Sequence, residues 1–225
     1  MKKVCVAMLF LAGIWGVSAQ DDGQAVVLEI QGRVELQDEG SAEWRAAAAG
    51  DLIGSNTVIA TGLKSSALIA LGSSRVEALP LTMLTLRELI QRSGGETTNL
   101  YLRTGRVRAT VNPPAGQTID FTVAAPNVTA SVRGTSFEFD GRQLRVEKGL
   151  VLLSVSNGQK VYVSAAQRSY IDENNQNRIV PPFEAEAELL KPVIPELNSI
   201  SSNAGMLEAR ISLEAEAASI NVDWP

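Results

Sequence analysis

The stretch Ala125-Pro-Asn-Val-Thr-Ala-Ser-Val-Arg-Gly-Thr-Ser-Phe-Glu-Phe139 decides the fold of this chain. Its apolar residues fall on even positions from Val128 to Val132 and on odd positions at Phe137 and Phe139. Side chains alternate faces along a strand, so each half predicts a strand with one buried face. A strand changes its buried parity only at an inserted residue or a bend. The sequence therefore predicts a β-bulge within this stretch.

Gly134 lies at the parity change, and a residue without a Cβ adopts backbone angles that other residues avoid. We therefore expect the bulge at Gly134, in an unfavourable conformation for other residues. Arg133 precedes it and could donate hydrogen bonds to backbone carbonyls or to a carboxylate. The interpretation of Arg133-Gly134-Thr135 as a folding device is favoured over a ligand site, which stays open.

Alternation of apolar and polar residues extends through most of the chain. Strands with one buried face are expected over residues 26–36, 107–111 and 119–123. The continuously apolar runs 67–71 and 150–153 predict strands covered on both faces. Residues 84–92 are the best helical candidate in this region. Glycines punctuate the runs, and this rhythm predicts an all-β domain.

A short pattern recurs at three places, Gln-Gly-Arg-Val at 31–34, Thr-Gly-Arg-Val at 104–107 and Lys-Gly-Leu-Val at 148–151. The spacing between the copies is not constant, so the recurrence does not predict a solenoid. We interpret each copy as a glycine turn that begins a new strand.

The composition excludes several classes of enzyme. The chain has 225 residues, a formal net charge of −5, no histidine and one cysteine. Without histidine, neither a Ser-His-Asp nor a Cys-His site exists, and no imidazole can hold a metal. Hydrophobic residues make up 45% of the chain, which is typical of a globular core. We predict no catalytic residue, no metal site and no cofactor.

The amino-terminal residues 1–19 have the pattern of a secretory signal peptide. Two lysines follow Met1, and residues 4–17 are apolar. The small residues Val17 and Ala19 stand at the two positions that specify cleavage. The apolar run is shorter than the ~20 residues that a membrane-spanning helix needs. We therefore expect cleavage after Ala19 and a location in the periplasm. An uncleaved signal anchor and secretion are the alternatives.

The composition changes near residue 178. Residues 179–225 contain 8 acidic and 2 basic residues, with prolines around the sequence Glu-Ala-Glu-Ala-Glu at 184–188. Apolar residues alternate again over 207–213 and 220–224. We predict one β domain over 20–178, followed over 179–225 by an acidic proline-containing linker and a β-rich carboxy-terminal extension.

Several segments together resemble the FecR-domain family. They are Gly-Asp-Leu-Ile at 50–53, Gly-Arg-Val-Arg-Ala at 105–109, the stretch 125–139 and Glu-Lys-Gly-Leu-Val at 147–151. The resemblance implies a periplasmic, rolled or sandwich-type antiparallel β domain. In the best-known members this domain belongs to a regulator that relays the state of an outer-membrane receptor to a sigma factor.

Those regulators have a cytoplasmic amino-terminal segment and a transmembrane helix. Here the expected export signal begins at Met1, so the chain looks like the solo exported members, and we do not expect a direct anti-sigma role. The stretch 125–139 and the resemblance together single out six residues, as structural elements or as partner contacts: Arg133, Gly134, Thr135, Phe137, Arg106 and Asp51.

Arg103, Arg106 and Arg108 could form a basic strip. The net negative charge and the lack of interleaved aromatic residues argue against nucleic acid as a partner. A solvated face of a sheet is the better interpretation of these arginines.

The sequence thus favours a non-enzymatic periplasmic module for binding, scaffolding or accessory signalling. Its expected partner is an envelope protein or a cell-wall component. The alternative is a carbohydrate-active or cell-wall-binding protein that uses Asp and Glu side chains, because glycoside hydrolysis requires only two suitably spaced carboxyl groups.

Overall fold

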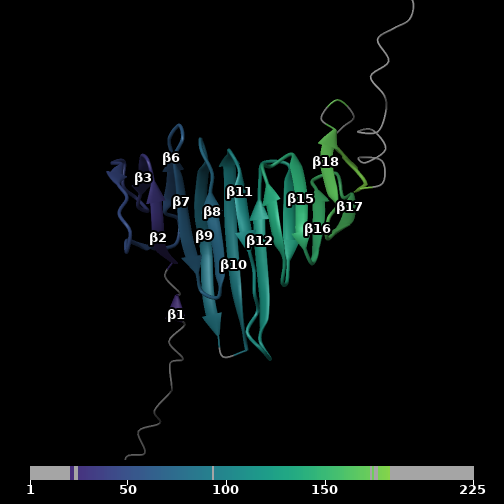
Figure 1. Cartoon of the computed structure of the whole chain (residues 1–225), viewed down its shortest axis with the longest axis horizontal. Coiled ribbons are helices and arrows are strands. Elements are labelled where there is room, and N and C mark those ends of the chain that lie inside the picture. Colours follow the sequence, from purple (N-terminus) through teal and green to yellow (C-terminus); the bar gives the residue numbers. More distant parts are fainter. Residues whose placement is uncertain (1–20, 23–24, 93, 173, 175–176, 183–225) are drawn as a thin grey trace, which may run out of the picture. The chain divides into compact units, whose positions relative to one another are not determined.

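The computed structural model describes residues 21–22, 25–92, 94–172, 174 and 177–182 (Figure 1). The chain divides into residues 1–185 and 186–225, and all described residues belong to the first unit. The predicted signal peptide at 1–19 and the alternating segments at 207–213 and 220–224 lie outside the described residues. No helix in the described part is long and apolar enough to cross a membrane.

Strands make up most of the described chain and form two sheets. Sheet A contains β1 (Asp21–Asp22), β3 (Val34–Gln37), β4 (Arg45–Ala46), β6 (Val58–Thr61), β9 (Met83–Arg92), β10 (Gly95–Thr104), β12 (Thr118–Ala124), β13 (Val128–Val132), β16 (Leu150–Val155) and β17 (Lys160–Ser164). Sheet B contains β2 (Ala25–Gln31), β5 (Leu52–Ile53), β7 (Ser66–Leu71), β8 (Ser74–Ala78), β11 (Val107–Thr110), β14 (Ser136–Phe139), β15 (Gln143–Lys148), β18 (Arg168–Asp172) and β19 (Arg178–Val180).

The chain crosses repeatedly between the two sheets and adds successive strands to the same side of each. From β6 onward, the order of strands within each sheet follows the sequence, as the colours in Figure 1 show. The hairpins β9–β10, β12–β13 and β16–β17 belong to sheet A, and β7–β8, β14–β15 and β18–β19 belong to sheet B. The pairs are antiparallel apart from β10 with β12, which β11 separates in sequence. The predicted all-β, rolled or sandwich-type antiparallel architecture is confirmed, with one parallel pair in sheet A.

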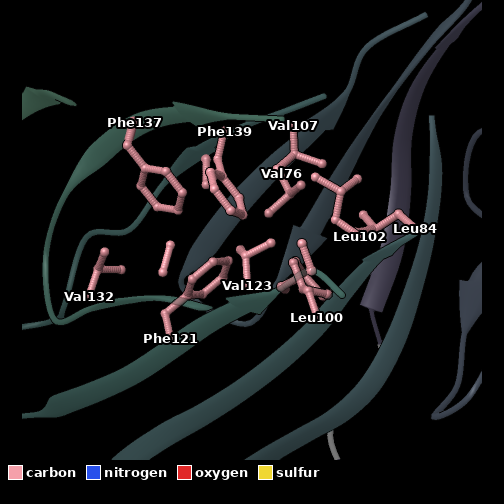
Figure 2. Close-up of a cluster of buried hydrophobic side chains, with 14 of the residues drawn as sticks. Val76, Leu84, Leu100, Leu102, Val107, Phe121, Val123, Val132, Phe137 and Phe139 are labelled. Atoms are coloured by element: carbon pink, nitrogen blue, oxygen red, sulfur yellow. The ribbon is translucent and has the colours of Figure 1, made fainter. Parts of the chain in front are cut away.

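The hydrophobic core lies between the sheets. Phe121 on sheet A meets Phe137 on sheet B edge to face, with ring centroids 6.4 Å apart (Figure 2). Val123 and Phe139 are also fully buried, and Figure 2 places them beside the two rings. Burying one such aromatic or aliphatic side chain stabilises the fold by roughly 1.5–3 kcal/mol. The buried side chains at alternate positions of each strand therefore hold the two sheets together.

The predicted helix over 84–92 is wrong, because this segment is most of β9. Its buried residues are Leu84, Leu86 and Leu89, so the alternation shifts by one position. The pairing explains the shift: Leu86 faces Leu100 and Glu88 faces Asn99, which leaves Arg87 as an extra residue. A bulge of this kind reverses the parity of a strand and hides its period from the sequence.

The three recurring glycine turns are crossovers between the sheets. Gly32 joins β2 to β3, Gly105 joins β10 to β11, and Gly149 joins β15 to β16. Their φ angles are +72°, +89° and +90°, which residues with a Cβ rarely adopt. The interpretation as turns that begin new strands is confirmed, and each one also transfers the chain to the opposite sheet.

A hydroxyl group from a neighbouring crossover supports each of these glycines. In every case the hydroxyl bonds to the backbone of the residue that follows the glycine. Arg33 N–H donates to Ser65 Oγ (2.9 Å), Arg106 N–H donates to Thr82 Oγ1 (2.9 Å), and Thr135 Oγ1 donates to Leu150 O (3.0 Å). Ser65, Thr82 and Thr135 are buried. Each of these hydrogen bonds therefore joins two crossovers as a pair.

The end of the described β domain lies close to the predicted boundary at residue 178. β19 crosses that boundary and pairs with β18 through Ile171 and Ile179. The division of the chain into two units falls after Ala185. The linker and the carboxy-terminal extension remain predictions.

Candidate functional site

The segment Arg133-Gly134-Thr135 is a crossover from β13 in sheet A to β14 in sheet B. Val132 and Phe137 both point into the core because they approach it from opposite sheets. The parity change is therefore a change of sheet, and the predicted bulge at Gly134 is wrong. Gly134 also lacks a left-handed φ; an added Cβ would lie 3.2 Å from Cδ of Pro113.

Thr135 and Phe137 are placed as parts of the folded core. Thr135 exchanges two backbone hydrogen bonds with Val111, at 2.9 and 3.0 Å, and its hydroxyl donates to the Leu150 carbonyl. Phe137 is fully buried against Phe121. Neither side chain is available to a partner in this arrangement, which supports a structural role for both.

Arg133 differs from its neighbours because its side chain is 82% exposed. Its Nε lies 3.4 Å from Oδ1 of Asp120, whose side chain is 65% exposed. An ion pair this exposed contributes at most about 1 kcal/mol, since water and salt screen it. Arg133 therefore contacts a carboxylate, which is one of the two kinds of hydrogen-bond partner predicted for it. This ion pair is too weak to hold the crossover in place.

An open groove of about 880 Å³ adjoins this crossover on the outer face of sheet A. β12, β13, β16 and β17 place their outward residues along it. Register aligns Thr122, Ser131, Leu152 and Tyr162 in one row across the four strands. The polar residues lie on β12 and β13, and the apolar ones on β16 and β17. The residues that line the groove are Pro113, Asp120, Phe121, Thr122, Ser131, Val132, Arg133, Gly134, Thr135, Leu150, Leu152 and Tyr162.

The apolar side of the groove was not predicted. The run 150–153 predicted a strand covered on both faces, whereas Leu150 is 48% exposed and Leu152 is half-buried. The prediction of two covered faces is therefore wrong for the outer face of β16. Tyr162 on β17 is 65% exposed beside them. The sequence signal for this surface was the continuous apolar run itself, which places apolar groups on the solvent-facing side of a strand.

Arg106 lies apart from the groove, in the Gly105 crossover. Its guanidinium contacts Glu138 Oε1 at 3.1 Å and Asp140 Oδ2 at 3.5 Å. Arg108 lies on the outer face of sheet B, between Glu77 (2.9 Å) and Glu138 (3.0 Å). Arg103 belongs to β10 in sheet A. The three arginines therefore do not form one basic strip, and the two on the sheet B side have acidic partners.

Asp51 directly precedes β5 in the sequence. One of its carboxylate oxygens accepts hydrogen bonds from the Ala48 N–H (3.0 Å) and from Arg45 (2.7 Å). The hydrogen bond from the Ala48 N–H, and to a smaller extent the one from Arg45, holds the pKa of the Asp51 carboxyl below its ordinary value.

Of the six predicted residues, the structure brings only Arg133, Gly134 and Thr135 together. Among the described residues, no three Cys, Asp or Glu side chains are arranged to hold a metal ion.

Two crystal structures from Parabacteroides distasonis ATCC 8503, each described as that of a candidate anti-sigma factor, are similar to this chain at 14% identity with a TM-score of 0.45. The similarity covers 60% of this chain and 64% and 65% of those chains, so this chain spans just under two thirds of their length. No curated protein matches the sequence.

Residues 57–159 match the sequence model of the family described as FecR protein. The matched region runs from the residue before β6 to the residue before β17, and it includes the crossover 133–135. The predicted resemblance is confirmed over this region: the chain carries a FecR domain at residues 57–159.

Proposed function

We propose that this chain is a non-enzymatic binding or scaffolding module of the cell envelope, with an accessory role in signalling. The observation that carries the proposal is the outer face of sheet A. Leu150 and Tyr162 expose apolar surface there, next to the charged pair Arg133 and Asp120. Apolar surface with charged groups at its rim is typical of a protein–protein contact. An envelope protein is therefore the partner that this surface fits best.

The envelope location in this proposal rests on the amino-terminal pattern at residues 1–19. Export to the periplasm with cleavage after Ala19 gives a chain that begins at Gln20. The intact mass of protein recovered from the envelope fraction tests this. A mass that still includes residues 1–19 would replace the periplasmic location with a signal-anchored one.

Crosslinking in intact cells tests the binding role. A photo-crosslinking amino acid at position 150 samples the groove, and the same amino acid at position 52 is the matched control. Leu150 and Leu52 are both exposed leucines, but Leu52 belongs to β5, a short edge strand of sheet B. We expect position 150 to capture a partner, identified by mass spectrometry, that position 52 does not. Recovery of only monomer from position 150 would contradict the proposal.

The alternative is a carbohydrate-active or cell-wall-binding protein. The lining of the groove offers one carboxylate, Asp120, and that group pairs with Arg133. Glycoside hydrolysis takes two carboxyl groups at a defined separation, so this groove favours binding over cleavage. Incubation of the purified protein with peptidoglycan and common glycans separates the two. Hydrolysis that is lost in Asp120→Asn would overturn the non-enzymatic proposal.

A further inference from the structure

The open edges of the two sheets differ in how much backbone they leave unpaired. Within the described residues, β4 and β5 end the sheets on one side and are two residues long. On the other side, sheet B ends in the three-residue β19 and sheet A ends in the five-residue β17. Short edge strands are a common protection against pairing with other chains. β17 is the longest of these four edges.

The edge of β19 is closed by a side chain. Gln159 Oε1 accepts a hydrogen bond from the Ile179 N–H at 2.8 Å, and Gln159 Nε2 donates to the Ile179 carbonyl at 3.1 Å. The primary amide thus pairs with Ile179 as an adjacent strand would. This leaves β17 as the edge at which added backbone could pair.

The register of β17 shows which of its backbone groups are free to pair. The Val155 N–H donates to the Gln159 carbonyl at 3.1 Å, and Val151 is opposite Val163. Hydrogen-bonded and non-hydrogen-bonded pairs alternate in an antiparallel ladder, so the backbone groups of Val163 face β16. Those of Lys160, Tyr162 and Ser164 face away from it.

The outward groups of Ser164 already have partners. Its N–H donates to Gln167 Oε1 at 3.0 Å, and its carbonyl accepts the Gln167 N–H at 3.1 Å. With respect to the described residues, the outward N–H and C=O groups of Lys160 and Tyr162 remain on the open edge. They are enough for a short ladder with an extended segment of polypeptide.

The side chains around this edge specify the kind of segment that fits. On the outer face, Tyr162 is exposed beside Leu152 and the groove. On the inner face, Val161 packs against the core. An added strand would place alternate side chains against these two apolar surfaces. Lys160 shares the outer face with Tyr162 and favours an acidic side chain opposite it.

We propose that β17 receives an extended segment of a partner protein as an added strand of sheet A, through the backbone of Lys160 and Tyr162. The segment alternates apolar residues and carries an acidic residue near Lys160. This inference rests on the proposed binding function and defines how the partner is held. The main chain supplies the hydrogen bonds, and Tyr162, Leu152 and Val161 select the side chains.

Hydrogen exchange of single backbone amides, measured by NMR on the full chain, tests the inference. The probe is a synthetic peptide of about nine residues with alternating Val and Thr and one Glu, long enough for an ordinary strand. The matched control peptide is N-methylated on its backbone and cannot donate. We expect the first peptide to slow exchange at Tyr162 about tenfold, as one or two new hydrogen bonds would. Val163, already paired with β16, stays unchanged, and the methylated peptide has no effect.

A pair of variants separates backbone from side chain. Tyr162→Pro removes the outward N–H, and Tyr162→Val keeps it in a strand-forming residue. We expect peptide binding to fall about tenfold in Tyr162→Pro and to change less than threefold in Tyr162→Val. Equal loss in both variants would overturn the strand-addition mode. If Tyr162→Pro does not fold, the exchange measurement on the unaltered chain still decides.

Failure of this inference is distinguishable from failure of the proposed function. A partner captured at position 150 that leaves exchange at Tyr162 unchanged would overturn strand addition, while the binding role stands. Protection of Tyr162 by the peptide, with no partner captured in cells, would support the edge and count against the binding role. If a peptidoglycan fragment slows hydrogen exchange of the groove residues while neither peptide binds, the proposal of a polypeptide partner is overturned.

Discussion

The Thr135 hydroxyl donates a hydrogen bond to the Leu150 carbonyl at 3.0 Å and thereby joins two successive crossovers between the sheets. Thr135 belongs to the crossover from sheet A to sheet B, and Leu150 follows Gly149 in the crossover back to sheet A. Ser65 and Thr82 form equivalent contacts beside Gly32 and Gly105. A buried hydroxyl next to a left-handed glycine is thus a repeated device of this fold.

Substitution of Gly149 tests the requirement for glycine at a crossover. Gly149 and Gly158 have φ angles of +90° and +91°, but only Gly149 faces other atoms, with Gly134 O at 2.6 Å from an added Cβ. Gly158→Ala should cost about 1–3 kcal/mol of unfolding free energy from backbone strain alone. Gly149→Ala should cost more, because the backbone of Gly134 must also move. Urea denaturation of both variants measures the difference, and equal costs would exclude the steric contribution.

Gly134 should tolerate substitution better than its place in the sequence motif indicates. Its φ is not left-handed, and the nearest atom to an added Cβ is Cδ of Pro113 at 3.2 Å. A shift of a few tenths of an ångström relieves that contact, so Gly134→Ala should cost less than about 1 kcal/mol. The melting temperatures of Gly134→Ala and Gly149→Ala, compared in one buffer, check this order. A lower melting temperature for Gly134→Ala would contradict it.

Removal of the Thr135 hydroxyl should destabilise the fold with little change in volume. Thr135→Val leaves the Leu150 carbonyl without this donor, at an expected cost of about 1–2 kcal/mol. Thr129→Val on the outer face of β13 is the control, since both residues are β-branched strand formers. Chemical denaturation should show the loss for Thr135→Val alone. Equal stability of the two variants would show that the Thr135 hydroxyl does not stabilise the fold.

Arg133→Ala should leave stability almost unchanged, because the ion pair with Asp120 is exposed. The expected change in unfolding free energy is below about 1 kcal/mol, and it should shrink further at high salt. Thermal melts at low and high salt measure it. A large drop in melting temperature would restore the sequence-based interpretation of Arg133 as a folding device. Normal melting with loss of the crosslinked partner would identify Arg133 as a contact residue.

Stability should fall in acid through Asp51. Hydrogen bonds from the Ala48 N–H and from Arg45 lower the pKa of Asp51 in the folded state below its ordinary value of 3.8. A lowered folded-state pKa stabilises the protein above the pKa of the unfolded chain, and this contribution is lost as pH falls through the folded value. Urea denaturation at pH 7, 4 and 3 should therefore show a smaller decline for Asp51→Asn than for the unaltered chain. An identical decline would exclude Asp51 from the acid response.

The sequence by itself determined the all-β class, the position of most strands and the glycine turns. These features are local: side-chain alternation follows from strand geometry, and the turns follow from the freedom of glycine. The residues around 125–139 also carried the family resemblance, which the match at 57–159 confirms. Alternation failed at the bulge beside Arg87, where an extra residue mimics a helical spacing. It also failed in β2, where Leu28 is an extra residue and is exposed, while Ala25 and Val27 are buried.

Only the tertiary structure decided which sheet each strand joins, and the surfaces depend on that decision. The parity change between Val132 and Phe137 is compatible with a bulge in one strand or with a crossing between two sheets, and pairing with β16 and with β11 selects the crossing. The same pairing leaves Leu150 exposed in a run that predicted cover on both faces, and it leaves Tyr162 at an open edge. Exposure depends on contacts between residues far apart in the chain, which a local pattern of residues does not encode.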